Sequence, residues 1–423
     1  MHKLLAVILA GGMGERLSIL SQERAKPAVP FAGKYRIIDF TLSNCINSGV
    51  NNIIVLTQYQ PVSLTEHIGI GAPWGLVPPD RSIRLLQPYL AREAGKDWYK
   101  GTADAVYQNL DRIESEEFDE VIILSGDHVY KMDYSGMLDF HRKQNADVTL
   151  AVTRMPETEL HRFGTVVTDE TDRVVRFQEK VKKPQSNLVS MGVYIFNMAT
   201  LRQSLDTRSG NDFGRNVFPK IIDSSKIYVY PYDGYWRDIG TIDSYWQASM
   251  EIMAMSQSFL ADTEWPIYTK EVEGPPTKIG DNTSVTNLLL SHGCKIEGHI
   301  EHSIISPGVH VAEGAVVRDS IIMNDAQVGR DCVIDRAILD KEVVIEPESR
   351  VGFGDDFKTN RAAPSILNSG LTLIGKGTVI PSGYTIGRNC IIYDHVNRSA
   401  LPTDAVESGE TVKPRRKKPR VVE

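Results

Sequence analysis

Two aspartates, Asp127 and Asp238, are the side chains with the clearest potential for chemistry. Asp127 follows a short polar turn that ends the apolar run 121–124, so it should lie at the carboxyl end of a buried strand. Asp238 lies between bulky aromatic residues and a glycine in the segment 235–241. Carboxylate oxygens are hard ligands that suit Mg²⁺, an ion that keeps waters and binds substrate phosphates. A lone aspartate more often caps a turn or a helix, but two carboxylates that meet at one sheet edge predict a magnesium site.

A glycine-rich segment near the amino terminus has the composition of a phosphate-binding loop. It follows the apolar run 4–9, an expected buried strand, and its glycines would let bare backbone N–H groups approach a phosphate. An arginine and a lysine within a dozen residues add two positive charges. The glycine spacing matches neither a Walker A loop nor the dinucleotide fingerprint, so the segment predicts a polyphosphate site of another kind. Its candidate residues are Leu9, Gly11, Gly12, Gly14, Arg16 and Lys26.

Composition limits the kind of protein. The chain has 423 residues, enough for two domains or more. Its net charge of −7 at pH 7 argues against nucleic acid or an anionic membrane as the main partner. The scattered cysteines form no C-x-x-C pair, which indicates reduced thiols rather than disulfides or zinc ligands. No apolar run is long enough to cross a bilayer or resembles a signal peptide. We therefore expect a soluble, cytoplasmic protein.

Strand-like and helical segments alternate over residues 1–260. That alternation is typical of a doubly wound, mostly parallel α/β sheet, which binds its ligands at the carboxyl ends of the strands. Residues 261–278 are rich in proline and glycine and predict a linker. The expected strands are 4–10, 52–56, 83–86, 121–124, 148–152, 193–196 and 227–230, and the expected helices are 39–48, 102–116, 134–144 and 245–255.

A different period begins after the linker. Small or branched apolar residues recur every six positions over 309–321, and after one five-residue step they do so again over 326–338. This hexad repeat predicts a left-handed parallel β-helix over 279–395, in which each coil buries its small apolar positions under the next. Ordinary β-hairpins would instead alternate with a period of two. Residues 396–423 are expected to form a basic, disordered tail.

Several sequence blocks resemble one enzyme family. The loop 9–17 resembles the signature loop of the sugar-phosphate nucleotidylyltransferases. Other blocks are similar to the bacterial glucose-1-phosphate adenylyltransferases within that superfamily, and the similarity runs from the first strand through the β-helix. These blocks are Arg24-Ala-Lys-Pro-Ala28, Arg36-Ile-Ile-Asp-Phe40, Leu42–Gly49, Trp98–Ala105, Gly126–Lys131 and Tyr235–Thr241. The segments Gly101–Ala105 and Tyr235–Thr241 narrow the sugar specificity most strongly.

This resemblance implies a reaction and a set of ligands. ATP and α-D-glucose 1-phosphate would give ADP-glucose and diphosphate with Mg²⁺, as the first step of glycogen synthesis. The implied catalytic residues are Arg16, Lys26, Asp127 and Lys180, and the implied metal ligands are Asp127 and Asp238. The implied glucose 1-phosphate ligands are Tyr99, Gly164, Glu179, Lys180 and Ser190. The implied nucleotide ligands are Leu9, Gly11, Gly12, Gly14, Gln87, Gly101 and Thr102.

One residue departs from the family pattern. Some bacterial members carry a lysine immediately before Arg24, where it belongs to an activator site for a sugar bisphosphate; this chain has Glu23, which would repel such an anion. The resemblance therefore implies an anionic effector of open identity, and it also implies a homotetramer. Two alternatives remain, a nucleotidylyltransferase for another base or sugar and a non-catalytic regulatory subunit of the same fold. Retention of all the implied catalytic and metal-binding residues counts against the second.

Overall fold

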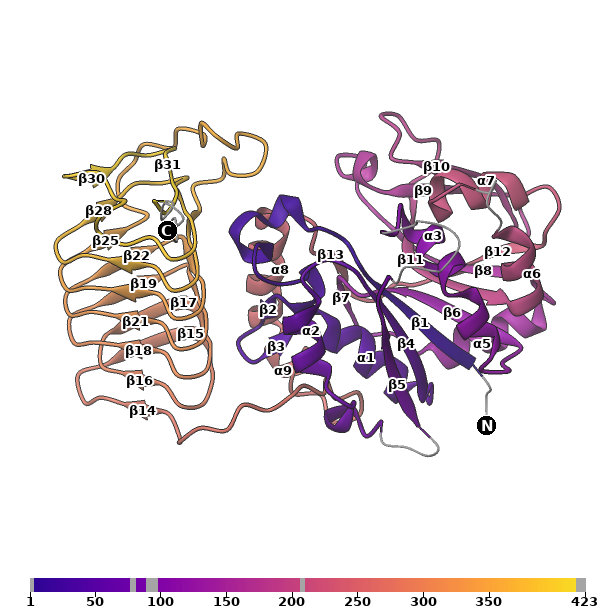
Figure 1. The fold of residues 1–423 in the computed structure, drawn as a ribbon, viewed down its shortest axis with the longest axis horizontal. Coiled ribbons are helices and arrows are strands. Elements are labelled where there is room, and N and C mark those ends of the chain that lie inside the picture. Colours follow the sequence, from indigo (N-terminus) through magenta and orange to yellow (C-terminus); the bar gives the residue numbers. More distant parts are fainter. Residues whose placement is uncertain (1–3, 77–80, 89–97, 206–209, 416–423) are drawn as a thin grey trace, which may run out of the picture. The chain divides into compact units, whose positions relative to one another are not determined.

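The computed structural model describes residues 4–76, 81–88, 98–205 and 210–415 (Figure 1). The last part of the expected basic tail, 416–423, lies outside the described residues. The chain divides into two compact units. The first unit consists of Met1–Met13, Ile37–Arg237 and Trp265–Tyr268. The second consists of Gly14–Arg36, Asp238–Glu264 and Thr269–Glu423.

A mixed, mostly parallel sheet forms the centre of the first unit, as the sequence predicts. Its strands run in the order β10-β9-β11-β6-β1-β4-β5, with β8 beside β11 and β12 beside β8. The apolar strands β1, β4, β5 and β6 pair in parallel, whereas β11 pairs antiparallel with β6, β8 and β9. The bounds are β1 (Leu4–Ala10), β4 (Asn52–Thr57), β5 (Ser82–Leu86), β6 (Glu120–Ser125), β8 (Val148–Arg154), β9 (Gly164–Thr168), β10 (Val174–Glu179), β11 (Leu188–Asn197) and β12 (Ile227–Pro231).

The helices of this unit follow the predicted alternation, with one correction. The helix expected over 102–116 is two helices, α3 (Thr102–Gln108) and α4 (Leu110–Glu114). Asn109 separates them, because its backbone leaves the helical region and its buried side-chain amide donates to the Ala105 carbonyl. The other helices are α1 (Ile37–Asn47), α2 (Pro61–Ile68), α5 (Tyr134–Lys143), α6 (Met198–Ser204) and α7 (Phe218–Ile221), with shorter turns η3 (Ala72–Trp74), η4 (Leu160–Arg162) and η5 (Phe213–Val217).

A second, two-stranded sheet lies beside the carboxyl ends of the main strands. It pairs β7 (His128–Tyr130) with β13 (Trp236–Asp238). The division between the two units falls inside β13, after Arg237. Asp238 is therefore described with its own strand, whose position follows from the pairing with β7.

The larger part of the second unit is a β-helix, coloured orange to yellow in Figure 1. Register partners lie 17 residues apart, as in His310 with Gln327 and Val316 with Val333. Two six-residue steps and one five-residue step give this length, so the predicted hexad pattern is confirmed. The strands are β14 (Lys278–Ile279), β15 (Ser284–Leu290), β16 (Lys295–Ile296), β17 (His299–Ile305), β18 (His310–Val311), β19 (Val316–Arg318), β20 (Ile321–Ile322), β21 (Gln327–Val328), β22 (Val333–Asp335), β23 (Ala337–Leu339), β24 (Val344–Ile345), β25 (Arg350–Val351), β26 (Thr372–Ile374), β27 (Val379–Ile380), β28 (Thr385–Ile386), β29 (Ile391–Ile392), β30 (Ala405–Val406) and β31 (Thr411–Val412).

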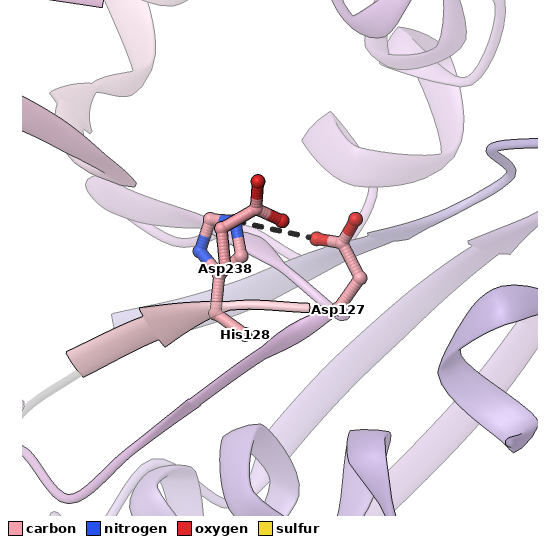
Figure 2. Close-up of side chains that lie close together, drawn as sticks. All are labelled: Asp127, His128 and Asp238. Atoms are coloured by element: carbon pink, nitrogen blue, oxygen red, sulfur yellow. Dashed lines mark ion pairs between the residues drawn. The ribbon is translucent and has the colours of Figure 1, made fainter. Parts of the chain in front are cut away.

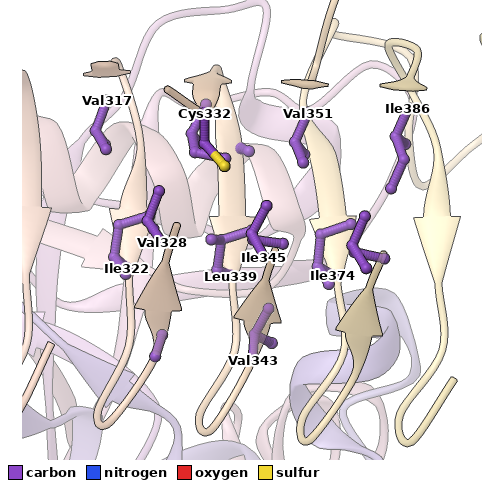
Figure 3. Close-up of a cluster of buried hydrophobic side chains, with 14 of the residues drawn as sticks. Val317, Ile322, Val328, Cys332, Leu339, Val343, Ile345, Val351, Ile374 and Ile386 are labelled. Atoms are coloured by element: carbon purple, nitrogen blue, oxygen red, sulfur yellow. The ribbon is translucent and has the colours of Figure 1, made fainter. Parts of the chain in front are cut away.

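The core of the β-helix is a stack of small and branched apolar side chains (Figure 3). Val328 and Ile345 come from successive coils and are almost fully buried. Cys332 is one of these side chains, and burial raises the pKa of its thiol. The cysteine therefore acts as a small apolar residue here.

The β-helix continues beyond residue 395, where the sequence analysis expected a tail. β30 pairs with β28, and β31 pairs with β29. Val406 and Val412 are buried in the core cluster of this unit. Two apolar positions and the turn at Gly409 are too short a signal to establish one more coil from the sequence. An excursion without strands also occurs, over residues 352–371.

Two further segments belong to the second unit and pack on the β-helix. The first contains η1 (Glu15–Ser21), η2 (Lys26–Ala28), β2 (Pro30–Phe31) and β3 (Tyr35–Arg36), and the second contains α8 (Ile242–Ala254) and α9 (Ser256–Phe259). The buried Arg24 guanidinium lies 2.8 Å from the Asp340 carboxylate of the β-helix. The Trp246 indole N–H of α8 donates to the Asp319 carbonyl. Residues 260–277 contain no helix or strand.

Candidate active site

A cavity of about 370 Å³ opens at the carboxyl ends of β1, β4 and β6. This is the edge at which a doubly wound sheet binds its ligands. Leu9 comes from β1, Leu56 from β4 and Ser125 from β6, so three neighbouring parallel strands supply its floor. The residues that line the cavity are Leu9, Gly11, Gly12, Met13, Leu56, Gln58, Tyr59, Tyr99, Lys100, Gly101, Thr102, Ala105, Ser125 and Asp127.

The glycine-rich loop turns sharply at Gly14. Its φ of 69° lies in the left-handed region, and a Cβ there would come within 3.0 Å of the Ser21 Cβ. The Ser21 hydroxyl donates to the Gly14 carbonyl at 2.7 Å and closes the turn. η1 follows immediately and carries the exposed Arg16. The local sequence therefore places a bare backbone and a cation within three residues.

Lys26 is buried, although lysine is usually exposed. Its ammonium lies 3.2 Å from the Asp238 carboxylate. Arg16 also approaches Asp238, since a Cβ placed on Gly240 would lie 3.2 Å from the Arg16 guanidinium and 2.8 Å from an Asp238 oxygen. The second unit thus gathers two cations and one carboxylate, a set that suits a polyanion and its metal.

Figure 2 shows Asp127, His128 and Asp238, whose ligand atoms lie within 4.8 Å of one another. The pairing of β7 with β13 brings these side chains together. The Ser125 hydroxyl donates to the Asp127 carboxylate and orients it. Two carboxylates form a hard-oxygen donor set that fits a divalent cation such as Mg²⁺.

Tyr99 forms one wall of the cavity, and two amide side chains fix it there. The Gln58 amide donates to the Tyr99 carbonyl at 3.3 Å. The Asn109 amide donates to the Tyr99 hydroxyl at 2.9 Å. The break between α3 and α4 at Asn109 therefore has a local role, because it turns this amide toward the tyrosine.

The amino-terminal end of α3 closes another side of the cavity. Gly101 is required there, since a Cβ would lie 2.3 Å from the Asn211 carbonyl oxygen. The same carbonyl accepts hydrogen bonds from the backbone N–H groups of Ala103 and Asp104. The Thr102 hydroxyl contacts the Asp212 carboxylate at 3.2 Å. The start of α3 is thus held by a segment more than a hundred residues away in the sequence.

The four implied sugar-site residues of the β9–β11 region converge on one end of this ribbon. Gly164 and Glu179 are register partners in β9 and β10, and Val189 of β11 pairs with Thr165 of β9, which places Ser190 alongside Gly164. Burial raises the pKa of the Glu179 carboxyl, although the neighbouring Lys180 opposes that shift. A Cβ on Gly164 would come within 2.6 Å of the Glu179 carboxylate, so glycine leaves the space for it.

Comparison with known proteins agrees with this architecture. Residues 5–255 match the family model described as nucleotidyl transferase, and residues 275–374 match the model described as GlmU-like, C-terminal hexapeptide. The glucose-1-phosphate adenylyltransferase of Thermomicrobium roseum is 50% identical over 425 residues, covering 98% of this chain and 98% of that protein. The enzyme of the same name from Acetivibrio thermocellus is 43% identical over 421 residues, covering 97% and 98%.

The chain belongs to the glucose-1-phosphate adenylyltransferase family. A further relative with this name, from Bacillus thuringiensis, is 48% identical over 352 residues, which cover 82% of this chain and 93% of that protein. The family places the chain among the nucleotidyltransferase enzymes. Within the described residues, none of the helices has both the length and the apolar character needed to span a membrane.

Several of the site residues predicted from the sequence line the cavity, and others do not. Leu9, Gly11, Gly12, Tyr99, Gly101, Thr102 and Asp127 all line the cavity. Gln87, the expected contact for the adenine edge, is exposed and is not among the lining residues; the glutamine at the cavity is Gln58. Sequence reasoning missed Gln58, Ser125 and His128. Gln58 had a usable signal, because it lies two residues after the carboxyl end of the expected strand 52–56.

Proposed function

We propose that this chain transfers the adenylyl group of ATP to α-D-glucose 1-phosphate, giving ADP-glucose and diphosphate. The observation that carries the proposal is the cavity at the ends of β1, β4 and β6. It combines a bare glycine loop, an amide side chain at Gln58 and the carboxylate of Asp127. Relatives that match this chain over almost their whole length carry the name of that reaction.

The chemistry needs little acid–base assistance. A phosphate oxygen of glucose 1-phosphate attacks the α-phosphorus of ATP; the new bond joins that oxygen to phosphorus, and the bond to the β-phosphate bridging oxygen breaks. The nucleophile is already anionic at neutral pH, so no proton has to be removed from it. The protein has to align two polyanions and offset their repulsion.

Each proposed residue has a task in that alignment. The backbone N–H groups around Gly11 and Gly12, with Arg16 and Lys26, would neutralise the departing diphosphate. Lys180 would bind the sugar phosphate. The glucose ring would lie against the apolar face of Tyr99, with its hydroxyls hydrogen-bonded by Glu179 and Ser190 and with Gly164 leaving them room. Gln58, which lines the cavity, would read the adenine edge in place of Gln87, since its amide can both donate and accept.

Asp127 and Asp238 would hold Mg²⁺, which supplies positive charge against the phosphates when it is bound. Ser125 would keep the Asp127 carboxylate in the orientation that the metal needs, and Lys26 would limit the negative charge at Asp238. We extend the proposal to a regulated cytoplasmic homotetramer that makes a glycogen precursor, as the sequence resemblance implies.

An anionic effector would have to find a site compatible with Glu23. His395 and Lys376 contact the Glu23 carboxylate at 3.1 and 3.4 Å. Although burial opposes the shift, hydrogen bonds from His395 and Lys376 lower the Glu23 pKa. A glutamate in this place therefore occupies the Lys376 ammonium and the His395 imidazole, which an anion would otherwise contact. For this reason fructose 1,6-bisphosphate is a weaker effector candidate than in relatives with lysine there.

The test is diphosphate release from purified protein with Mg²⁺. ATP, GTP, UTP and dTTP are each combined with glucose 1-phosphate and with mannose 1-phosphate, and Asp127→Asn serves as the inactive control. Turnover confined to ATP with glucose 1-phosphate, and lost in Asp127→Asn, supports the proposal. A preference for another nucleotide or sugar overturns the specificity. No turnover with any pair, even with phosphorylated sugars added as effectors, indicates a regulatory subunit instead.

A further inference from the structure

His128 adds a nitrogen atom to the carboxylate pair. It is the first residue of β7 and directly follows Asp127, and its Nε2 lies 3.5 Å from the Asp127 carboxylate. All three ligand atoms of Asp127, His128 and Asp238 fall within the spacing that one ion can bridge (Figure 2). Proximity alone is weak evidence for metal coordination, because a histidine beside carboxylates is often only a hydrogen-bond partner. The orientation of the imidazole ring decides whether His128 is a metal ligand or a hydrogen-bond partner.

The other ring nitrogen fixes that orientation. His128 Nδ1 lies 3.0 Å from the Met191 carbonyl oxygen, which can only accept, so Nδ1 carries the hydrogen. In the neutral ring, Nε2 then has the lone pair, and Nε2 is the atom that faces Asp127. Trp236 meets the ring edge-on at 5.1 Å and limits its rotation. This arrangement, with Nδ1–H bonded to a backbone carbonyl and Nε2 turned inward, is how metal-binding histidines are usually held.

We infer that His128 is a third protein ligand of the metal, through Nε2, beside Asp127 and Asp238. The inference rests on the proposed function, because it concerns the same cation. Asp127 and His128 each have an outer partner, the Ser125 hydroxyl for the carboxylate and the Met191 carbonyl for the imidazole. An imidazole nitrogen suits Mn²⁺ and Co²⁺ better than Mg²⁺, which prefers oxygen alone. The site should therefore bind Mn²⁺ more tightly than Mg²⁺.

Pulsed electron paramagnetic resonance of bound Mn²⁺ tests this inference directly. The full chain is loaded with Mn²⁺ and inorganic diphosphate, a probe without nitrogen, so any nitrogen coupling comes from the protein. We expect a ¹⁴N coupling that changes to a ¹⁵N pattern when the protein is made with ¹⁵N-histidine. Bound Mn²⁺ without a histidine coupling overturns the inference and leaves the imidazole as a hydrogen-bond donor. Failure to bind Mn²⁺ overturns it as well.

Variants give an independent measurement. His128→Gln should lose the histidine coupling and weaken Mn²⁺ binding about tenfold or more, whereas His161→Gln, at an exposed histidine, should change neither. Unaltered Mn²⁺ affinity in a folded His128→Gln protein would contradict the assignment. The nucleotide panel separates this result from the proposed function. Turnover without a histidine coupling refutes only the ligand, and a histidine coupling without turnover refutes only the reaction.

Discussion

Lys180 is an unusual residue in its local geometry. Its φ of 50° is positive, a region that residues other than glycine seldom adopt, and its ammonium lies 3.5 Å from the Glu179 carboxylate. Its backbone N–H donates to the Phe163 carbonyl at 3.1 Å, which holds the turn at the end of β10. Strained backbone maintained by neighbouring bonds is common at ligand sites. The turn therefore presents a cation next to the proposed glucose contacts.

Lys180→Ala should raise the KM for glucose 1-phosphate about 100-fold or more, while kcat changes less, because the lost charge would bind the sugar phosphate in the ground state as well as in the transition state. Steady-state kinetics with varied glucose 1-phosphate measure both constants. Lys183→Ala, at an exposed lysine three residues away, is the matched control and should behave like the parent protein. A similar KM for both variants would remove Lys180 from the site.

At the scale of elements, the start of α3 depends on a contact between backbone groups. The Asn211 carbonyl binds the first N–H groups of the helix, and Gly101 leaves room for it. Gly101→Ala should push the start of α3 away from the Asn211 carbonyl and displace Thr102 in the cavity. We expect kcat/KM for ATP to fall about tenfold or more. Asn211→Ala keeps the carbonyl and should have little effect, and equal losses in both variants would refute this account.

Asp394 marks the contact of the 14–36 segment with the β-helix. It is buried and accepts the Lys376 backbone N–H at 2.9 Å. Burial, with repulsion from Asp340 and Glu23, raises the pKa of this carboxyl to about 6 from its usual 3.8. The folded protein binds this proton more tightly than the unfolded chain does. The contribution to stability is therefore complete below about pH 4 and is lost as the pH rises to about 6.

Asp394→Asn should stabilise the protein at pH 7.5, because the amide oxygen can still accept the Lys376 N–H without carrying a charge. The gain is about 3 kcal/mol at most, and it should vanish at pH 4. Thermal denaturation of both proteins across this pH range measures the difference. The exposed Asp404→Asn is the control and should follow the parent protein at each pH. A stability difference that does not change with pH would contradict the pKa shift.

The elements were largely predictable because their signals are local. The run 4–10 is apolar throughout, and the structure makes it the buried strand β1 with the same bounds. The hexad spacing with one five-residue step gave the 17-residue coil of the β-helix. The break at Asn109 was not predictable, because every residue from 102 to 116 is compatible with a helix. The structure shows that the break accompanies two hydrogen bonds of the Asn109 amide, to the Ala105 carbonyl and to the Tyr99 hydroxyl.

At the scale of the whole molecule, the site was predictable where residues follow strand ends. Asp127 and the glycine loop lie at the carboxyl ends of parallel strands, so topology alone brings them to one edge. His128 was not predictable, because its role depends on the Met191 carbonyl of a strand sixty residues away. Gln87 also follows a strand end, but β5 is the last strand in the order and its end does not reach the cavity.

The last coil of the β-helix allows a test of whether β30 and β31 contribute to the stability of this unit. A protein ending at residue 415 retains β30 and β31 and should melt at the same temperature as the full chain. A protein ending at residue 395 loses β30 and β31, which cover β28 and β29. Val406 and Val412 are 2% and 8% exposed, and losing two such buried side chains costs about 3–6 kcal/mol.

We therefore expect the shorter protein to melt several degrees lower, since a change of 1 kcal/mol shifts the midpoint of a large domain by about 2–4 °C. It should also associate, because its new terminal strands expose unpaired backbone groups and apolar side chains. Circular dichroism melting and light scattering measure the two effects. Equal melting of both shortened proteins would mean that residues 396–415 only decorate a β-helix that is already complete at β29.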